Sequence, residues 1–399
     1  MRRRMTLPAA LGILFAACSG SRGATAIETP YVTTAGAIAI ANLDQQIAQR
    51  GNASGVEELL LVRSRFLGDY DALDRASTIA EARFETAADL MRRARARSAV
   101  HRFADALRDV NAAERAGAPG DECESLRASI LVATGHASDV VPQLEAAVAR
   151  HAGFASRSAL AGAYGAIGRL EDADASYVAA LGNLDTTLPF PFAWIYFARG
   201  MMWTEQGRDS TRGAALYAQA LSHLPEFATA NIHLAEIEVG RGELDSAMKR
   251  LERVVASSNE PEARALLGVL HVRTGDPARG WQEVSLARQR FEALLARHPL
   301  AFADHAAEFY IGPGADAERA WTFAQQNLAN RETPRALALA IKAARAAGRE
   351  ADARALVARA AADSNRSALV ARVGSMSSAN HVQDARTVGL ARRAQPLLY

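Results

Sequence analysis

Small and large apolar residues alternate along residues 154–181 in a pattern typical of two helices joined by a turn. Gly168 lies in the middle, where a helix would end. After it, Ala173, Tyr177 and Ala180 follow at intervals of four and three residues, which places them on one helical face. Antiparallel helices approach closely where a small side chain faces a large one. The stretch therefore predicts a helical hairpin.

The same unit returns through most of the chain, and most steps between equivalent turn positions are 33 or 34 residues. The residues at the expected turns are Gly68, His101 to Phe103, Gly135, Gly168, Gly242, Gly275, Gly312 to Gly314 and Gly348. This pattern resembles the tetratricopeptide repeat, whose period is about 34 residues. The resemblance implies an all-α fold, a right-handed α-solenoid of about nine helical hairpins.

We expect the array to occupy residues 34–362, beginning with a helix from about Thr34 to Gln49. Irregular links interrupt the repeat near 183–192, which is proline-bracketed, and near 288–301, where one second helix continues further than the others. We interpret both as insertions in one superhelix, with a division into two arrays near residue 185 as the alternative. The pattern is lost in residues 363–399, which would form a C-terminal cap or a disordered tail.

The first residues are typical of an export signal. Three arginines precede a short apolar run, and small residues then lead to Cys18. This resembles a bacterial lipobox and implies a signal peptide over 1–18, lipidation of Cys18 and a tether over 19–33. The protein would then be an outer-membrane lipoprotein that faces the periplasm or the cell surface. Cleavage after Ala26, which would release a soluble periplasmic or secreted protein, is the alternative.

Composition and the absence of short motifs limit the classes of molecule that the protein is expected to bind. The formal net charge is only +2, which gives no bias toward nucleic acid. Aromatic residues make up 6% of the chain, which favours closely packed, alanine-rich helices. The basic run from Met91 to Arg97 spreads around its helix and is interpreted as a solvated face. Phosphate-binding loops, dinucleotide fingerprints and hydrolase motifs do not occur. We therefore expect no cofactor, no nucleic acid and no small-molecule substrate.

The first helix of each hairpin is expected to line the concave face, because the resemblance implies it. The residues that this register places there are Trp194, Phe197, Met201, Ile232, Glu236, Phe302, His305 and Phe309. They would form an apolar groove for a peptide. The other interpretation is that these aromatic residues fill gaps created by the two insertions.

A second candidate site joins Asp304, His305 and Glu308, which lie within one helical turn. Such a trio suits a metal or acid–base site, although zinc sites normally contain more histidine or cysteine. A solvated helix face explains the spacing equally well.

Together these features predict a non-enzymatic, exported scaffold that binds a protein or peptide in its concave face and a membrane through its lipid anchor. A structural subunit of an envelope assembly is the first alternative, and a metal-dependent site around Asp304, His305 and Glu308 is the second.

Overall fold

The computed structural model describes residues 31–362, which form 19 α-helices and no strand. Their bounds are α1 Gly36–Arg50, α2 Val56–Leu67, α3 Tyr70–Glu81, α4 Ala87–Ala99, α5 Phe103–Arg115, α6 Gly120–Ala133, α7 Ala137–Arg150, α8 Phe154–Ala166, α9 Leu170–Leu181, α10 Pro189–Glu205, α11 Ser210–His223, α12 Ala228–Gly240, α13 Leu244–Ser257, α14 Pro261–Arg273, α15 Pro277–Arg297, α16 Pro299–Ile311, α17 Ala317–Asn330, α18 Pro334–Ala346 and α19 Glu350–Ala362. The expected all-α class is confirmed.

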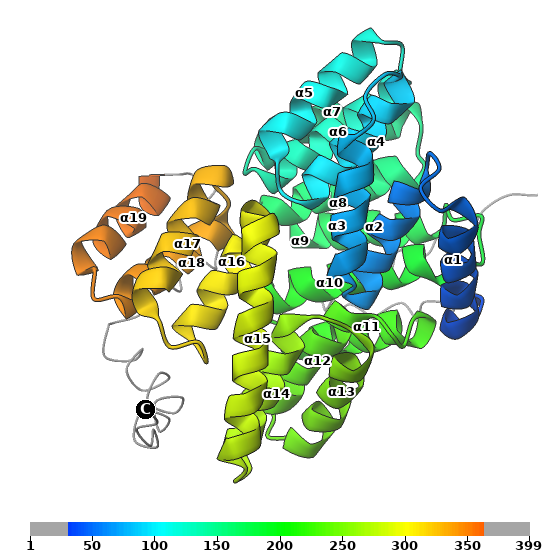
Figure 1. Ribbon diagram of the computed structural model, residues 1–399. Helices are drawn as coiled ribbons and strands as arrows, with labels where there is room; N and C mark the ends of the chain where they lie inside the picture. The colour runs from blue at the N-terminus through cyan, green and yellow to red at the C-terminus, as the bar shows by residue number, and fades with distance from the viewer. Residues whose placement is uncertain (1–30, 363–399) are drawn as a thin grey trace, which may run out of the picture. The chain divides into compact units, whose positions relative to one another are not determined.

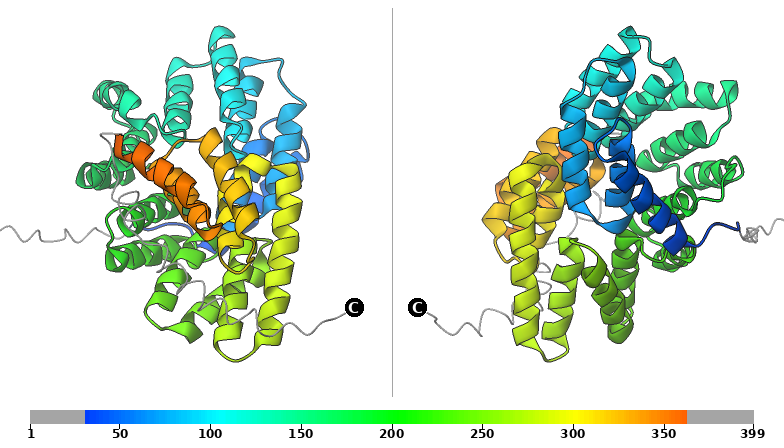
Figure 2. Two further views of the ribbon diagram at one scale, coloured as in Figure 1. Left: turned by 90° about the vertical axis from the view of Figure 1, so that its left-hand side faces the viewer. Right: turned by 45° about the vertical axis from the view of Figure 1, so that its right-hand side comes forward.

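After α1, consecutive helices pair into hairpins from α2 and α3 to α18 and α19, and the hairpins stack in chain order (Figures 1 and 2). Glycine in the left-handed region makes the tight turn at several hairpins, as at Gly168, where φ is +84°. Inside that hairpin, Ala161, Ala173 and Ala180 are fully buried, so that the two backbones can close on each other. The stacked solenoid of helical hairpins agrees with the sequence pattern.

First helices contact first helices of the next hairpin at several steps, including α6 with α8 and α16 with α18. They therefore share one side of the stack, which we call the inner face. The expected irregular link near 288–301 is mostly helical, because α15 continues to Arg297 and α16 begins at Pro299. Helix α10 follows the proline-bracketed link, and α15 extends over 21 residues, the longest helix of the described chain (Figure 1).

Helices from the start of the array also contact helices from its second half. Helix α2 touches α12, where the rings of Phe66 and Phe227 lie 4.8 Å apart. Ion pairs continue this contact, from Asp71 to Arg290 at 3.0 Å and from Asp74 to His298 at 3.1 Å. Residues 33–362 belong to one compact unit, which includes the helices on both sides of the link before α10.

Three expectations lie outside the described residues: the signal peptide with Cys18, the alternative cleavage site at Ala26, and the cap or tail over residues 363–399. Within the described part, no helix has the combination of length and apolar character that crossing a bilayer demands.

Candidate functional site

The inner face carries a series of charged side chains that joins four hairpins through ion pairs. In α16, His305 donates a hydrogen bond to Glu262 of α14 and lies 3.8 Å from Asp304. Asp304 in turn is ion-paired with Arg331, which follows α17. These contacts link hairpins through opposite charges, so that each buried charge has a partner.

The protonation of His305 follows from these neighbours. Burial alone would lower the pKa of His305, but the carboxylates of Asp304 and Glu262 raise it to about 10. The imidazole is therefore protonated at neutral pH. The pKa of Asp304 moves in the opposite direction, because burial is outweighed by the positive charges of His305 and Arg331.

Arg335 of α18 reaches two carboxylates on other hairpins. Its guanidinium lies 3.0 Å from Glu205 of α10 and 3.7 Å from Glu308 of α16. Displacement of water by the surrounding chain raises the pKa of Glu308 although 44% of its side chain stays exposed; the nearby Glu262 adds to the rise, and Arg335 lowers it. One cation thus serves two carboxylates at this point of the inner face.

Half of the residues that the sequence assigned to the concave face are accessible to a partner. Trp194 and Met201 of α10 are half-buried, Glu236 of α12 is exposed, and His305 is half-buried. Glu236 accepts a hydrogen bond from His233 at 3.0 Å. All four residues belong to first helices, and whether they line a concave face that binds a partner stays a prediction.

The other four residues are buried by the chain's own side chains. Phe197 packs on Phe227, with ring centroids 4.9 Å apart, and Phe302 packs edge-on against Tyr70 of α3 at the same separation. Ile232 and Phe309 are also buried, the latter beside the rings of Phe291 and Tyr310. Phe197 and Phe302 thus serve contacts with other hairpins.

A cavity of about 240 Å³ opens between α8 and α10. Its apolar walls come from both helices and from α9, and Glu205 and Gln206 supply its polar groups. The lining residues are Gly162, Gly165, Ala166, Tyr177, Trp194, Ala198, Met201, Met202, Glu205 and Gln206. Two of the predicted residues, Trp194 and Met201, therefore line a preformed cavity.

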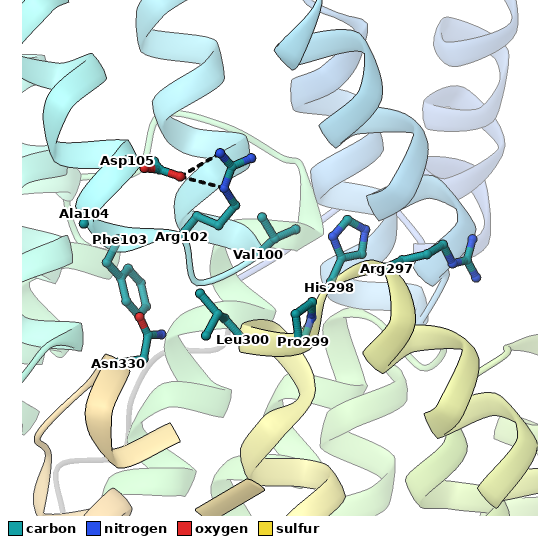
Figure 3. A pocket seen from close by; sticks show the side chains of 10 residues that line it. All are labelled: Val100, Arg102, Phe103, Ala104, Asp105, Arg297, His298, Pro299, Leu300 and Asn330. Atoms are coloured by element: carbon teal, nitrogen blue, oxygen red, sulfur yellow. Dashed lines mark hydrogen bonds and ion pairs between the residues drawn. The ribbon is translucent and has the colours of Figure 1, made fainter. Parts of the chain in front are cut away.

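A second cavity, of about 320 Å³, lies where the turn between α4 and α5 meets the start of α16 (Figure 3). Its cations already have partners: Arg102 is hydrogen-bonded to Asp105 at 2.7 Å, and Arg297 is ion-paired with Asp74 at 2.6 Å. We assign no function to this cavity, because its charges are satisfied.

Asp304, His305 and Glu308 do not form a site of their own. Each is held by a residue outside α16, namely Arg331, Glu262 and Arg335. A protonated imidazole is also a poor metal ligand, since ligation requires the neutral ring. Among the described residues, no group of three histidine, cysteine or acidic side chains is placed to hold a metal ion.

Sequence reasoning missed Glu205, Glu262 and Arg335. Glu205 follows Met201 by one helical turn and could have been found by extending the stripe on α10. The contact of Arg335 with Glu205 joins residues 130 positions apart, so local spacing carries no signal for it.

Residues 208–277 match the model of the tetratricopeptide repeat family. Together with the repeated hairpins, this match makes the chain an α-solenoid scaffold. More particularly, residues 208–277 carry the tetratricopeptide repeat, and the other hairpins of the described chain stack in the same way. No curated protein matches the sequence.

Three solved structures are similar in fold. The first is a chain of the APC/C hetero-tetramer Cut9-Hcn1, with 13% identity and a TM-score of 0.44 over 82% of this chain; the match spans 64% of that chain, less than two thirds. The second is a tetratricopeptide repeat protein from Parabacteroides merdae ATCC 43184, with 13% identity, a TM-score of 0.39, and coverage of 65% of this chain and 99% of that one. The third is a Rap protein complexed with competence and sporulation factor, with 14% identity, a TM-score of 0.47, and coverage of 74% and 97%. Likenesses at this level carry no information on partners.

Proposed function

We propose that this protein is a non-enzymatic scaffold that binds a protein or peptide partner on the inner face, along α10, α12 and α16. The observation that carries the proposal is the cavity beside Trp194 and Met201, which is bordered by the charged series from Glu205 to His305. Half-buried apolar side chains supply affinity, and fixed charges around them set the orientation of a bound segment.

The chemistry of the inner face favours binding over catalysis. His305 is held protonated between two carboxylates, and its raised pKa of about 10 makes it a poor general base at neutral pH. Asp304 is equally committed to its ion pair with Arg331. Such groups hold hairpins in place and present a fixed pattern of charge.

A selection experiment tests this proposal. A random peptide library would be selected on the full chain, and the recovered peptides measured by fluorescence anisotropy. Trp194→Ala and Met201→Ala should each weaken binding at least ~10-fold, as truncation of a buried anchor does. Met248→Ala, which removes the same side chain from the second helix α13, is the matched control and should leave affinity unchanged. Recovered peptides that bind all variants equally would exclude the inner face as the binding surface.

We also propose that the protein is exported and anchored in the outer membrane through Cys18, on the periplasmic or surface side. The support is the sequence of the first 18 residues, with its arginines, apolar run and small residues before the cysteine. Radioactive palmitate should label the wild-type chain and not the Cys18→Ala variant. Unlabelled wild-type protein whose N-terminus follows Ala26 would favour the secreted alternative.

A further inference from the structure

We propose that the cavity between α8 and α10 takes one lysine or arginine side chain from an extended segment of the partner, with its charged head on the carboxylate of Glu205. This inference rests on the proposed function and names the chemistry that the inner face recognises.

The size of the cavity suits a single side chain. At about 240 Å³ it falls below the ~300–1,000 Å³ typical of pockets for small-molecule ligands. Two glycines of α8 keep it open, since a Cβ at Gly162 would have only the hydroxyl of Tyr177 near it, at 3.8 Å. The walls of Trp194, Met201 and Met202 suit the aliphatic stem of a long side chain, and Glu205 suits its charged end.

The charges around the cavity leave one carboxylate in excess. Two nearby acids of the inner face have a cation of their own, since Glu262 is paired with His305 and Glu236 with His233. Glu205 and Glu308 share the single guanidinium of Arg335, which lies closer to Glu205 but bonds only one of its oxygens, Oε1. The second oxygen of Glu205 remains available to another cation.

Arg65 of α2 does not supply this charge, although its guanidinium lies 5.0 Å from the ring centroid of Trp194. The side chain of Arg65 is exposed, yet the surrounding chain displaces enough water to lower its pKa, and no carboxylate raises it. Arg65 therefore stacks on one wall of the cavity without neutralising Glu205.

The chain itself shows how this fold holds an arginine. At three places a guanidinium lies over an aromatic ring and meets a carboxylate of a neighbouring helix, a combination that stabilises both ends of the side chain. These are Arg212 on Trp203 at 3.6 Å with Asp174 at 2.9 Å, Arg319 on Tyr310 at 4.5 Å with Glu292 at 2.7 Å, and Arg169 on Tyr164 at 4.0 Å with Glu145 at 3.4 Å. The cavity offers the same ring and carboxylate, and no basic residue lines it.

The test uses peptides recovered from the random library on the full chain. We expect them to share a lysine or arginine, and replacing that residue by norleucine should weaken binding about 10- to 100-fold, the usual worth of a hydrogen bond to a charged group. Glu205→Gln should cause a similar loss for the basic peptide and little change for the norleucine peptide. Glutamine keeps an oxygen that accepts from Arg335, so the contact between α10 and α18 is preserved.

A variant that fills the cavity tests its occupancy independently of any indirect effect of replacing Glu205. Gly162→Leu places a side chain into the open space and should abolish binding of the basic peptide, while the thermal midpoint stays the same or rises. Gly240→Leu is the matched control, because a Cβ there meets nothing within 4 Å and α12 ends at that residue.

The outcomes separate the two proposals. Peptides that depend on Trp194 but have no basic residue, or that bind Gly162→Leu normally, would overturn this inference and leave the proposed function intact. Peptides that bind the Trp194→Ala and Met201→Ala variants as tightly as the wild type would show that the proposed function is wrong. The test also covers another source of a basic side chain, namely the arginines at 366, 372, 386, 392 and 393 of the chain's own sequence. If replacing all five by glutamine tightens binding of the basic peptide about 10-fold, the cavity serves this segment and the partner proposal is wrong.

Discussion

Replacing Asp174 by asparagine is expected to destabilise the middle of the array more than any other single change of charge that we consider. Asp174 of α9 accepts hydrogen bonds from Arg199 at 2.9 and 3.1 Å, from the indole of Trp203 at 2.9 Å and from Arg212 at 2.9 Å. It thereby joins α9, α10 and α11, which belong to two consecutive hairpins. Both Asp174 and Arg199 are buried.

The expected magnitude follows from what the substitution leaves behind. Asparagine has nearly the same shape, but its amide cannot neutralise Arg199 and directs an N–H donor at other donors. Removing one partner of a buried ion pair costs about 3–5 kcal/mol. Asp172→Asn is the matched control, because Asp172 lies two residues away in the same helix, is half-exposed and pairs with Arg169 at 2.7 Å. A surface pair of this kind contributes at most about 1 kcal/mol.

Urea unfolding at neutral pH, followed by circular dichroism, measures both variants. Because stability in a repeat array is built from neighbouring interfaces, Asp174→Asn is also expected to make unfolding biphasic. A loss within about 1 kcal/mol of the Asp172→Asn value would refute the reasoning. A double variant, Asp174→Leu with Arg199→Met, should recover much of the loss, since a hydrophobic pair can replace a buried ion pair. If the double variant is as unstable as the single one, packing and not charge is responsible.

Two further predictions concern contacts between distant hairpins. Burial raises the pKa of Glu260 from 4.5 to about 8, and the nearby Glu262 adds to the rise. Between these two pH values the folded chain keeps a proton that the unfolded chain releases, so the stability of the fold falls as the pH rises. Glu260→Gln should therefore raise the thermal midpoint more at pH 8 than at about pH 5, and an equal effect at both pH values would contradict the assignment. Gly135 has φ of +97°, and a Cβ there would lie 2.3 Å from the carbonyl oxygen of Glu332, whereas Gly168 has φ of +84° and nothing within 4 Å. Gly135→Ala should thus cost about 1–3 kcal/mol more than Gly168→Ala in urea unfolding, and equal losses would mean that the turn moves away without cost.

The order and number of the hairpins could be predicted from the sequence because their signals are local. Gly168 and the alanines around it specify one turn and one close crossing, and the spacing of 33 or 34 residues repeats that information. The long helix α15 was also predicted, since its apolar spacing continues to Arg297. The contact of α2 with α12 could not be predicted in this way, because it joins surfaces that are far apart in the chain.

This limit explains the mixed outcome for the aromatic residues of α10 and α16. A solenoid whose early hairpins meet its later ones needs apolar side chains at that contact, and Phe302 supplies one against Tyr70. Burial there removes the ring from any partner, although the helical register alone places it on the same face as His305. Trp194 and Met201 differ because the cavity beside them leaves their surfaces open. The residues that distinguish a binding surface from a packing surface are therefore those beside open space, and only the arrangement of the hairpins determines where that space lies.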